Sequence, residues 1–152
     1  MNSTEEINQL KETIAKYEQI INETSVPIIP SIIDNTILLP IVGYTDQDRL
    51  ERIRTKVLSY SGKHREIEYA IFDFSGIRLE DEDGSVVLTS ELRLMQAELQ
   101  LMGIRPMMVG FTPPFVRELT NAGIASEIES YANFKAALQV LMFEQGLTFT
   151  KV

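Results

Sequence analysis

The pattern of apolar and polar positions changes after the first 25 residues. Between positions 7 and 21, apolar residues recur at alternating intervals of three and four, which indicates a helix with a narrow apolar seam. Ser3 and Glu6 have the spacing of a capping box at its start, and Pro27 cannot continue the helix. We therefore expect a helix within residues 1–25, with the seam Ile7, Leu10, Ile14, Tyr17 and Ile21.

Two interpretations of this helix stay open. A narrow, regular seam is typical of a helix that dimerises or that carries a signal between domains. An ordinary amphipathic helix instead packs against its own domain. About two to three heptads are only marginally stable alone, so the first interpretation requires a partner or a preceding module. The candidate dimer contacts are Ile7, Leu10, Ile14 and Ile21.

From residue 26 onward, strand-like and helix-like segments alternate. We expect strands at 27–33, 36–42, 66–72, 105–110 and about 127–131, and helices at about 46–60, 85–102, 113–123 and from 134. Thr45, Thr112 and Asn133 are the expected helix caps. Two prolines place the first strand at a sheet edge, and strands joined by helices are parallel. The prediction is one α/β domain over 26–152, order ββαβαβαβα, with a mixed, mostly parallel sheet of about four or five strands and about four helices.

Composition excludes several classes of function. The chain has 14 Lys and Arg against 22 Asp and Glu, a net charge of −8, which opposes binding to nucleic acid or to an anionic membrane. It has no cysteine and a single histidine, His64, so disulfides, thiolate nucleophiles and sites with two imidazoles are impossible. Apolar runs are far shorter than the ~20 residues that span a bilayer, and Met1 begins a polar stretch. We expect a cytoplasmic protein.

The candidate chemistry lies in the loops after the parallel strands, at residues 73–85 and 110–113. The acidic run 80–83 contains a fragment of a calcium-loop pattern but lacks its remaining ligands. Negative charge just before a helix is favoured without any ligand. Asp73 has no lysine or second acid at the spacing that catalysis requires, so we interpret it as a turn-forming residue. We expect no catalytic residue, no metal site and no cofactor.

A series of modest motifs nevertheless occurs in a specific order, from about residue 22 to 143. They are Pro27–Pro30, Asn35–Gly43, Asp73–Ile77, Gly103–Gly110, and a helix carrying Pro113, Leu119, Gly123 and Ile124. Together they resemble the STAS domain family, the fold of anti-sigma factor antagonists. The sequence is most similar to the RsbR-type co-antagonists of the bacterial stressosome, in which a linker helix also leads straight into the STAS domain.

The resemblance implies a regulatory protein-interaction domain rather than an enzyme. STAS domains of this type pack with RsbS-like and RsbR-like subunits into dimers or larger assemblies and bind an RsbT-type switch kinase. The kinase phosphorylates a Ser or Thr at the start of the second domain helix. That position aligns near Val86, so Ser85 is the acceptor candidate, although it could also be an ordinary N-cap. The expected kinase-docking loop is Asp83, Gly84, Ser85 and Val86.

A second acceptor position of RsbR proteins aligns close to Glu118, where a carboxylate would be a weak permanent mimic of the phosphorylated state. Two other functions stay open from the residues alone. One is a STAS module that senses a small ligand, or relays a signal, without phosphorylation. The other, with the least support, is a small enzyme that uses Asp73 or the acidic run with a divalent metal.

Overall fold

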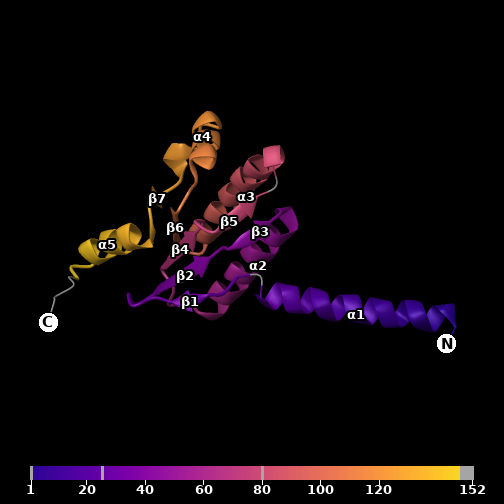
Figure 1. The fold of residues 1–152 in the computed structure, drawn as a ribbon. Helices are drawn as coiled ribbons and strands as arrows, with labels where there is room; N and C mark the ends of the chain where they lie inside the picture. The colour runs from indigo at the N-terminus through magenta and orange to yellow at the C-terminus, as the bar shows by residue number, and fades with distance from the viewer. Residues whose placement is uncertain (1, 25, 80, 148–152) are drawn as a thin grey trace.

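Parallel strands form the centre of the molecule (Figure 1). The computed structural model describes residues 2–24, 26–79 and 81–147. Strand β1 pairs antiparallel with β2, and all further neighbours in the main sheet are parallel. The sheet order is β1 (Ile29–Pro30), β2 (Thr36–Pro40), β4 (Tyr69–Asp73), β6 (Arg105–Val109) and β7 (Ser130–Tyr131). This confirms the predicted α/β class and the mixed, mostly parallel sheet.

Helices cover both faces of this sheet, as parallel strands require. In Figure 1, α2, α3 and α4 lie on one side and α5 lies on the other. Their bounds are α2 (Gln47–Lys63), α3 (Asp81–Leu101), α4 (Pro113–Asn121) and α5 (Phe134–Glu144), with a short 3-10 turn at Ala125–Glu127 before β7. Because side chains alternate along a strand, Phe72 packs in the larger core under α2 and α3, while Ile71 packs under α5.

A second, two-stranded sheet was not expected from the sequence. It pairs β3 (Gly43–Thr45) with β5 (Ile77–Leu79) in parallel, directly beyond the ends of β2 and β4. Backbone bonds from Ile41 N to Asp73 O and from Gly43 N to Gly76 O, both 2.9 Å, join the two sheets. Strands of three residues are too short to show an alternating pattern, so periodicity could not detect them.

Several element boundaries differ from the predicted ones because of local caps. The Asp46 carboxylate accepts the Arg49 N–H at 2.9 Å, so α2 is capped by Asp46 and not by Thr45. Asn133 caps α5 as expected, and Pro113 begins α4 after Thr112. The predicted strand 27–33 is reduced to two residues, since Pro27 and Pro30 have no N–H to pair.

Helix α1 (Ser3–Thr24) projects away from the sheet (Figure 1). Asn2 caps it, because the Asn2 side chain accepts the Glu5 N–H at 2.9 Å; the predicted capping box at Ser3 is therefore wrong. The seam side chains are exposed: Ile7 by 50%, Leu10 by 63%, Ile14 by 55% and Tyr17 by 61%. Packing of this seam on its own domain is thus excluded for these four residues, while the side chain of Ile21 lies outside the described residues.

Two charged clusters hold elements together. Arg105 donates to Glu129 at 2.6 Å through two nitrogens and to Glu144 at 2.6 and 3.1 Å, which ties β6 to the approach to β7 and to the end of α5. Burial alone would raise the pKa of Glu129, but hydrogen bonds from Arg105 and Tyr131 outweigh it and hold that pKa low. The hydrogen bonds from Arg105 likewise lower the pKa of Glu144. In the other cluster, Arg54 of α2 bridges Glu91 and Glu98 of α3.

We predict that the contribution of the Arg105 cluster depends on pH. A carboxylate whose pKa is lowered by folding stabilises the protein when the pH is above the usual pKa of the group, 4.5. This stabilisation is lost as the pH falls through the lowered pKa. Arg105→Met should therefore lower the free energy of unfolding at pH 7 and have progressively less effect below pH 4.5. Urea denaturation at several pH values measures this.

The matched control is Arg93→Met, because Arg93 and Glu127 are both exposed and 3.5 Å apart. Such surface pairs contribute about 0–1 kcal/mol, so this change should have little effect at any pH. A loss from Arg105→Met that is the same at pH 7 and at pH 3 would contradict the ionic account and indicate lost packing instead.

Candidate functional site

The site begins where β4 and β6 end side by side. Because parallel strands run the same way, the segments after Asp73 and after Val109 leave the sheet at one edge. The Asp73 carboxylate accepts the Ser75 N–H at 2.9 Å, which closes a tight turn. The Phe74 N–H donates to Val109 O at 2.9 Å. Asp73 therefore has the turn-forming role that the sequence predicted.

Gly110 holds the two exits in contact. Its φ of +78° lies in the region that glycine adopts without strain. A Cβ at this position would lie 2.7 Å from Ser75 N and 2.9 Å from the Asp73 carboxylate oxygen, so the turn after β4 packs directly on the Gly110 backbone. Phe111 then continues the contact, with its ring 5.4 Å from Phe74 and 4.9 Å from Phe115 at the start of α4. The rings fix α4 relative to the end of β4.

The start of α3 differs from the prediction. The expected loop Asp83–Val86 is helical, because α3 begins at Asp81. Ser85 is the fifth residue of the helix, so the interpretation of Ser85 as an N-cap is wrong. Acidic residues near a helix N-terminus are favoured by the helix dipole, which explains why the helix extends back through Asp81, Glu82 and Asp83.

Gly84 anchors this first turn of α3. It is buried, and a Cβ at Gly84 would lie 2.8 Å from the Leu79 Cβ and 3.4 Å from the Leu79 carbonyl carbon. The helix thus packs directly on the last residue of β5. A glycine inside a helix costs about 1 kcal/mol relative to alanine. Glycine is nevertheless required at position 84, because a side chain there would overlap Leu79.

Ser85, the acceptor candidate, is partly exposed. Its carbonyl accepts the Thr89 hydroxyl at 2.8 Å. Helical spacing places Ser85 three and four residues after Glu82 and Asp81, that is, one turn beyond them. A phosphate on Ser85 would lie past the free N–H groups of the first turn and next to two acidic positions, so it would meet repulsion more than stabilisation.

Glu118 lies on α4 and is partly exposed, with its carbonyl accepting the Ala122 N–H at 2.9 Å. It therefore belongs to a different helix from Ser85. The structure leaves both the acceptor role of Ser85 and the mimic role of Glu118 as predictions.

Sequence reasoning missed three exposed apolar side chains, two next to or in β3 and one in the first turns of α3. Val42 is 63% exposed, Tyr44 is 44% exposed and Val86 is 53% exposed. The Arg78 guanidinium lies 5.9 Å from the centre of the Tyr44 ring. We call Val42, Tyr44, Arg78, Ser85 and Val86 the switch surface. No signal could have revealed it, because Val42 was expected inside a strand and β3 and β5 were not expected at all.

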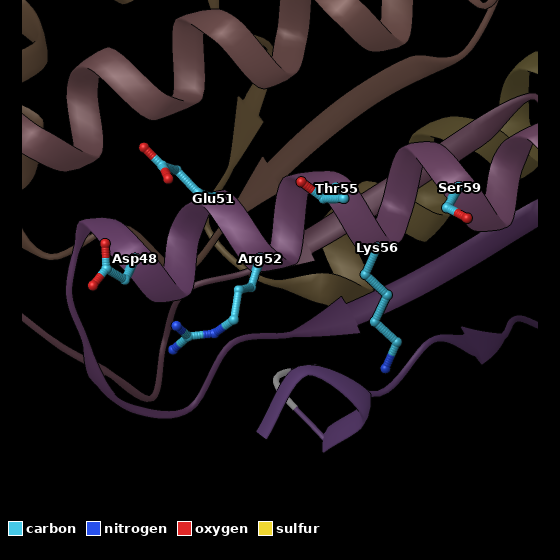
Figure 2. Close-up of a pocket in the computed structure, with 6 residues that line it drawn as sticks. All are labelled: Asp48, Glu51, Arg52, Thr55, Lys56 and Ser59. Carbon is cyan, nitrogen blue, oxygen red and sulfur yellow. The ribbon is translucent and has the colours of Figure 1, made fainter. Parts of the chain in front are cut away.

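A separate hollow of about 490 Å³ lies along the outer side of α2 (Figure 2). Figure 2 shows Arg52 and Lys56 extending from the same side of α2, and the Lys56 ammonium donates to Val26 O at 2.5 Å. The residues that line the hollow are polar or charged: Asp48, Glu51, Arg52, Thr55, Lys56 and Ser59. Ligand pockets are mostly apolar and enclosed, so this open, polar stripe of one helix is weak support for ligand sensing.

Two further findings concern only the residues that the structure describes. None of their His, Asp and Glu side chains form a group of three or more that could hold a metal ion. No helix in these ranges is long and apolar enough to cross a membrane.

Comparison with known proteins identifies sequence relatives, although no family model matches the chain. The RsbT co-antagonist protein RsbRB of Bacillus subtilis (strain 168) is 31% identical over 134 residues, which cover 88% of this chain and 46% of RsbRB. RsbRA of the same organism is 27% identical over 126 residues, or 80% of this chain and 44% of RsbRA. The chain thus spans about half the length of the curated relatives it matches.

Solved structures show the same fold. A single-residue variant of Moorella thermoacetica RsbS superposes with a TM-score of 0.60 at 21% identity, over 80% of this chain and 98% of RsbS. A chain from the stressosome, described as a signal integration and transduction hub, superposes with a TM-score of 0.54 at 18% identity. The superposition covers 78% of this chain and 98% of the stressosome chain. The chain therefore has the STAS fold, which confirms the fold that its motifs predicted. Its sequence relatives RsbRA and RsbRB indicate that it is RsbR-like.

We predict that Gly84→Ala destabilises the domain even though alanine favours helices. The added Cβ must displace Leu79, whose nearest atoms are its own Cβ and backbone, and such overpacking costs about 1–3 kcal/mol. The control is Gly62→Ala in α2, where a Cβ meets nothing within 4 Å. That change should stabilise by about 0.5–1 kcal/mol. Thermal unfolding of both variants measures the difference, and equal stabilisation by both would show that α3 does not pack on β5 as described.

Proposed function

We propose that this chain is a non-enzymatic regulatory domain that docks an RsbT-type switch kinase and assembles with other STAS proteins. The observation that carries the proposal is the similarity to two RsbT co-antagonist proteins along 80–88% of the chain. The switch surface supports it, because Val42, Tyr44 and Val86 are exposed apolar or aromatic side chains near the ends of the strands and on the first turns of α3. Apolar and aromatic residues that gather on a surface are typical of protein interfaces.

We propose that the docking of the kinase is regulated by phosphorylation of Ser85. Since Ser85 lies one turn after Asp81 and Glu82, roughly two added negative charges would repel that first turn. Gly84 gives this turn little intrinsic helix stability, and its contact with Leu79 is the part that repulsion would loosen. Phosphorylation would thereby alter the docking surface at its edge.

Glu118 would add a fixed negative charge on α4, a second helix that follows a strand exit. The aromatic chain from Phe74 through Phe111 to Phe115 links α4 to the end of β4. We therefore propose that regulation at this second position is replaced by a constant charge.

The proposed partner of α1 is a second copy of this chain. Ile7 and Ile14 occupy the a positions of a heptad and Leu10 occupies d, a pattern that favours two parallel strands. In that arrangement Glu6, at g, faces Lys11, at e, of the second copy, so the flanking charges attract. Pairing would cover the exposed seam and place both STAS domains at one end.

Intact mass after incubation with ATP and an RsbT-type kinase tests the proposed switch. The wild-type chain should gain one phosphate, and Ser85→Ala should gain none. Thr89→Val is the matched control, because Thr89 is buried one turn further along α3 and its loss leaves Ser85 available.

A phosphate that persists in Ser85→Ala would move the acceptor elsewhere. A stable complex with the kinase and no phosphate would establish docking without substrate function. No complex and no phosphate, with the fold intact by circular dichroism, would overturn the proposed function.

Substitutions in the α1 seam test dimerisation. Leu10→Asp and Ile14→Asp should each reduce the dimer to a monomer, because a buried carboxylate in a helix seam is strongly unfavourable. The STAS domain should stay folded, since neither side chain packs on it. Gln9→Asp adds the same charge off the seam and should leave the dimer intact. Sedimentation velocity measures the mass, and dimers that survive both seam changes would place the interface elsewhere.

A further inference from the structure

Helix α3 is apolar on two opposite faces. Its inner face contributes Leu88, Leu92, Met95 and Leu99 to the core, each at most 1% exposed. Its outer face carries Leu94, 47% exposed, and Leu101, 88% exposed. Ser90 and Ala97 are also exposed. We call Ser90, Leu94, Ala97 and Leu101 the outer stripe; none of these four residues is charged.

The outer stripe has the spacing of a helix-pairing seam. Its members follow at intervals of four, three and four, as a and d positions do. Leu94 and Leu101 fall at a, while Ser90 and Ala97 fall at d. The stripe therefore alternates small and large side chains along its whole length.

We propose that the outer stripe is a contact surface for the same stripe of a second copy, with the two α3 helices antiparallel across a two-fold axis. Antiparallel helices pair each a position with a d position. Leu94 then lies against Ala97 of the second copy, and Leu101 lies against Ser90 of the second copy. A parallel pair would instead stack leucine on leucine and small residue on small residue, which leaves uneven layers. A surface that supplies both the large residues and the matching small ones is self-complementary, as a two-fold contact requires. This inference extends the assembly part of the proposed function and is independent of kinase docking.

The flanks of the stripe are compatible with this arrangement. On one side, Glu91 and Glu98 are both bonded to Arg54, at 3.2 and 2.6 Å, so one of their two negative charges is balanced before the copies meet. On the other side, Arg93 would face Gln100 of the second copy, a pair without like-charge repulsion.

A hollow of about 400 Å³ lies beside the stripe on the Arg93 side, between α3 and the segment around Ile128. Ala97 and Gln100 belong to its lining. The hollow thus offers room for side chains from the second copy.

The contact should be weak by itself. Twelve helical residues, 90–101, extend about 18 Å, and one helix face buries less than the roughly 1,200 Å² of stable interfaces. Small residues at d allow the axes to approach closely, which improves packing without adding area. Such contacts become effective when other contacts hold the copies together.

Disulfide cross-linking tests the contact, because the chain has no cysteine of its own. The full chain carries Ile14→Asp, so that α1 pairing cannot mediate the result. Leu94→Cys with one mass tag is mixed with Ala97→Cys bearing another, and oxidised dimers are resolved by mass. Ser90→Cys mixed with Leu101→Cys tests the second layer. Val116→Cys on α4 is the control for random collision, since Val116 is exposed by 47%, as is Leu94.

The antiparallel register predicts that mixed dimers exceed each homodimer by far more than the roughly twofold excess that random collision of equal amounts gives. Their yield should exceed that of Val116→Cys by about tenfold, because apposed thiols have a far higher effective concentration. Dominant homodimers of Leu94→Cys would indicate a parallel pair and overturn the register. Yields equal to the Val116→Cys control would overturn the contact, and kinase binding retained in the same variants would leave the proposed function standing.

Discussion

The parallel pairing of β2, β4 and β6 is the constraint on which the rest of the structure depends. Parallel strands need helical crossovers, and those helices cover both faces of the sheet. The same pairing brings the exits of β4 and β6 to one edge, where Gly110 lies against the Asp73–Ser75 turn. The position of α4 follows from that contact, while the start of α3 is fixed by the packing of Gly84 on β5.

Helix α3 connects the two interactions proposed for the protein. Its first turn packs on β5 through Gly84 and borders the switch surface. Its middle and end carry the outer stripe, while its inner face supplies part of the core. A charge added at Ser85 would act on the turn that links these surfaces. Docking at one end of a helix and self-contact along the rest can therefore coexist without competing for residues.

The sequence predicted those parts of the fold that depend on periodicity and caps. The helices at α2, α4 and α5, the central strands and the Asn133 cap were all detectable, because regular apolar spacing and cap chemistry act locally. The start of α3 was not, since an acidic run followed by glycine is equally typical of a loop. The helix dipole, which favours acidic residues at this end, and the contact between Gly84 and Leu79 together explain the helix there. The pair of β3 and β5 depends on tertiary bonds between short segments, which no local pattern encodes.

The candidate site was located only in part for the same reason. Asp73 and Ser85 were identified from their order along the chain, but Val42 and Tyr44 join the site through the β3 and β5 pair. The seam of α1 was visible in sequence, whereas its exposure required the structure, which shows Ile7, Leu10, Ile14 and Tyr17 open to solvent. Patterns can define an apolar face, but not what that face packs against.

Calorimetric titration of the full chain with an RsbT-type kinase from the same organism tests the central claim most directly. We expect saturable binding by the wild-type chain, strongly weakened by Tyr44→Asp on the switch surface and retained by Leu101→Asp at the far end of α3. Absence of binding by the folded wild-type chain would contradict the account. Binding that is unaffected by Tyr44→Asp would contradict the assignment of the docking surface.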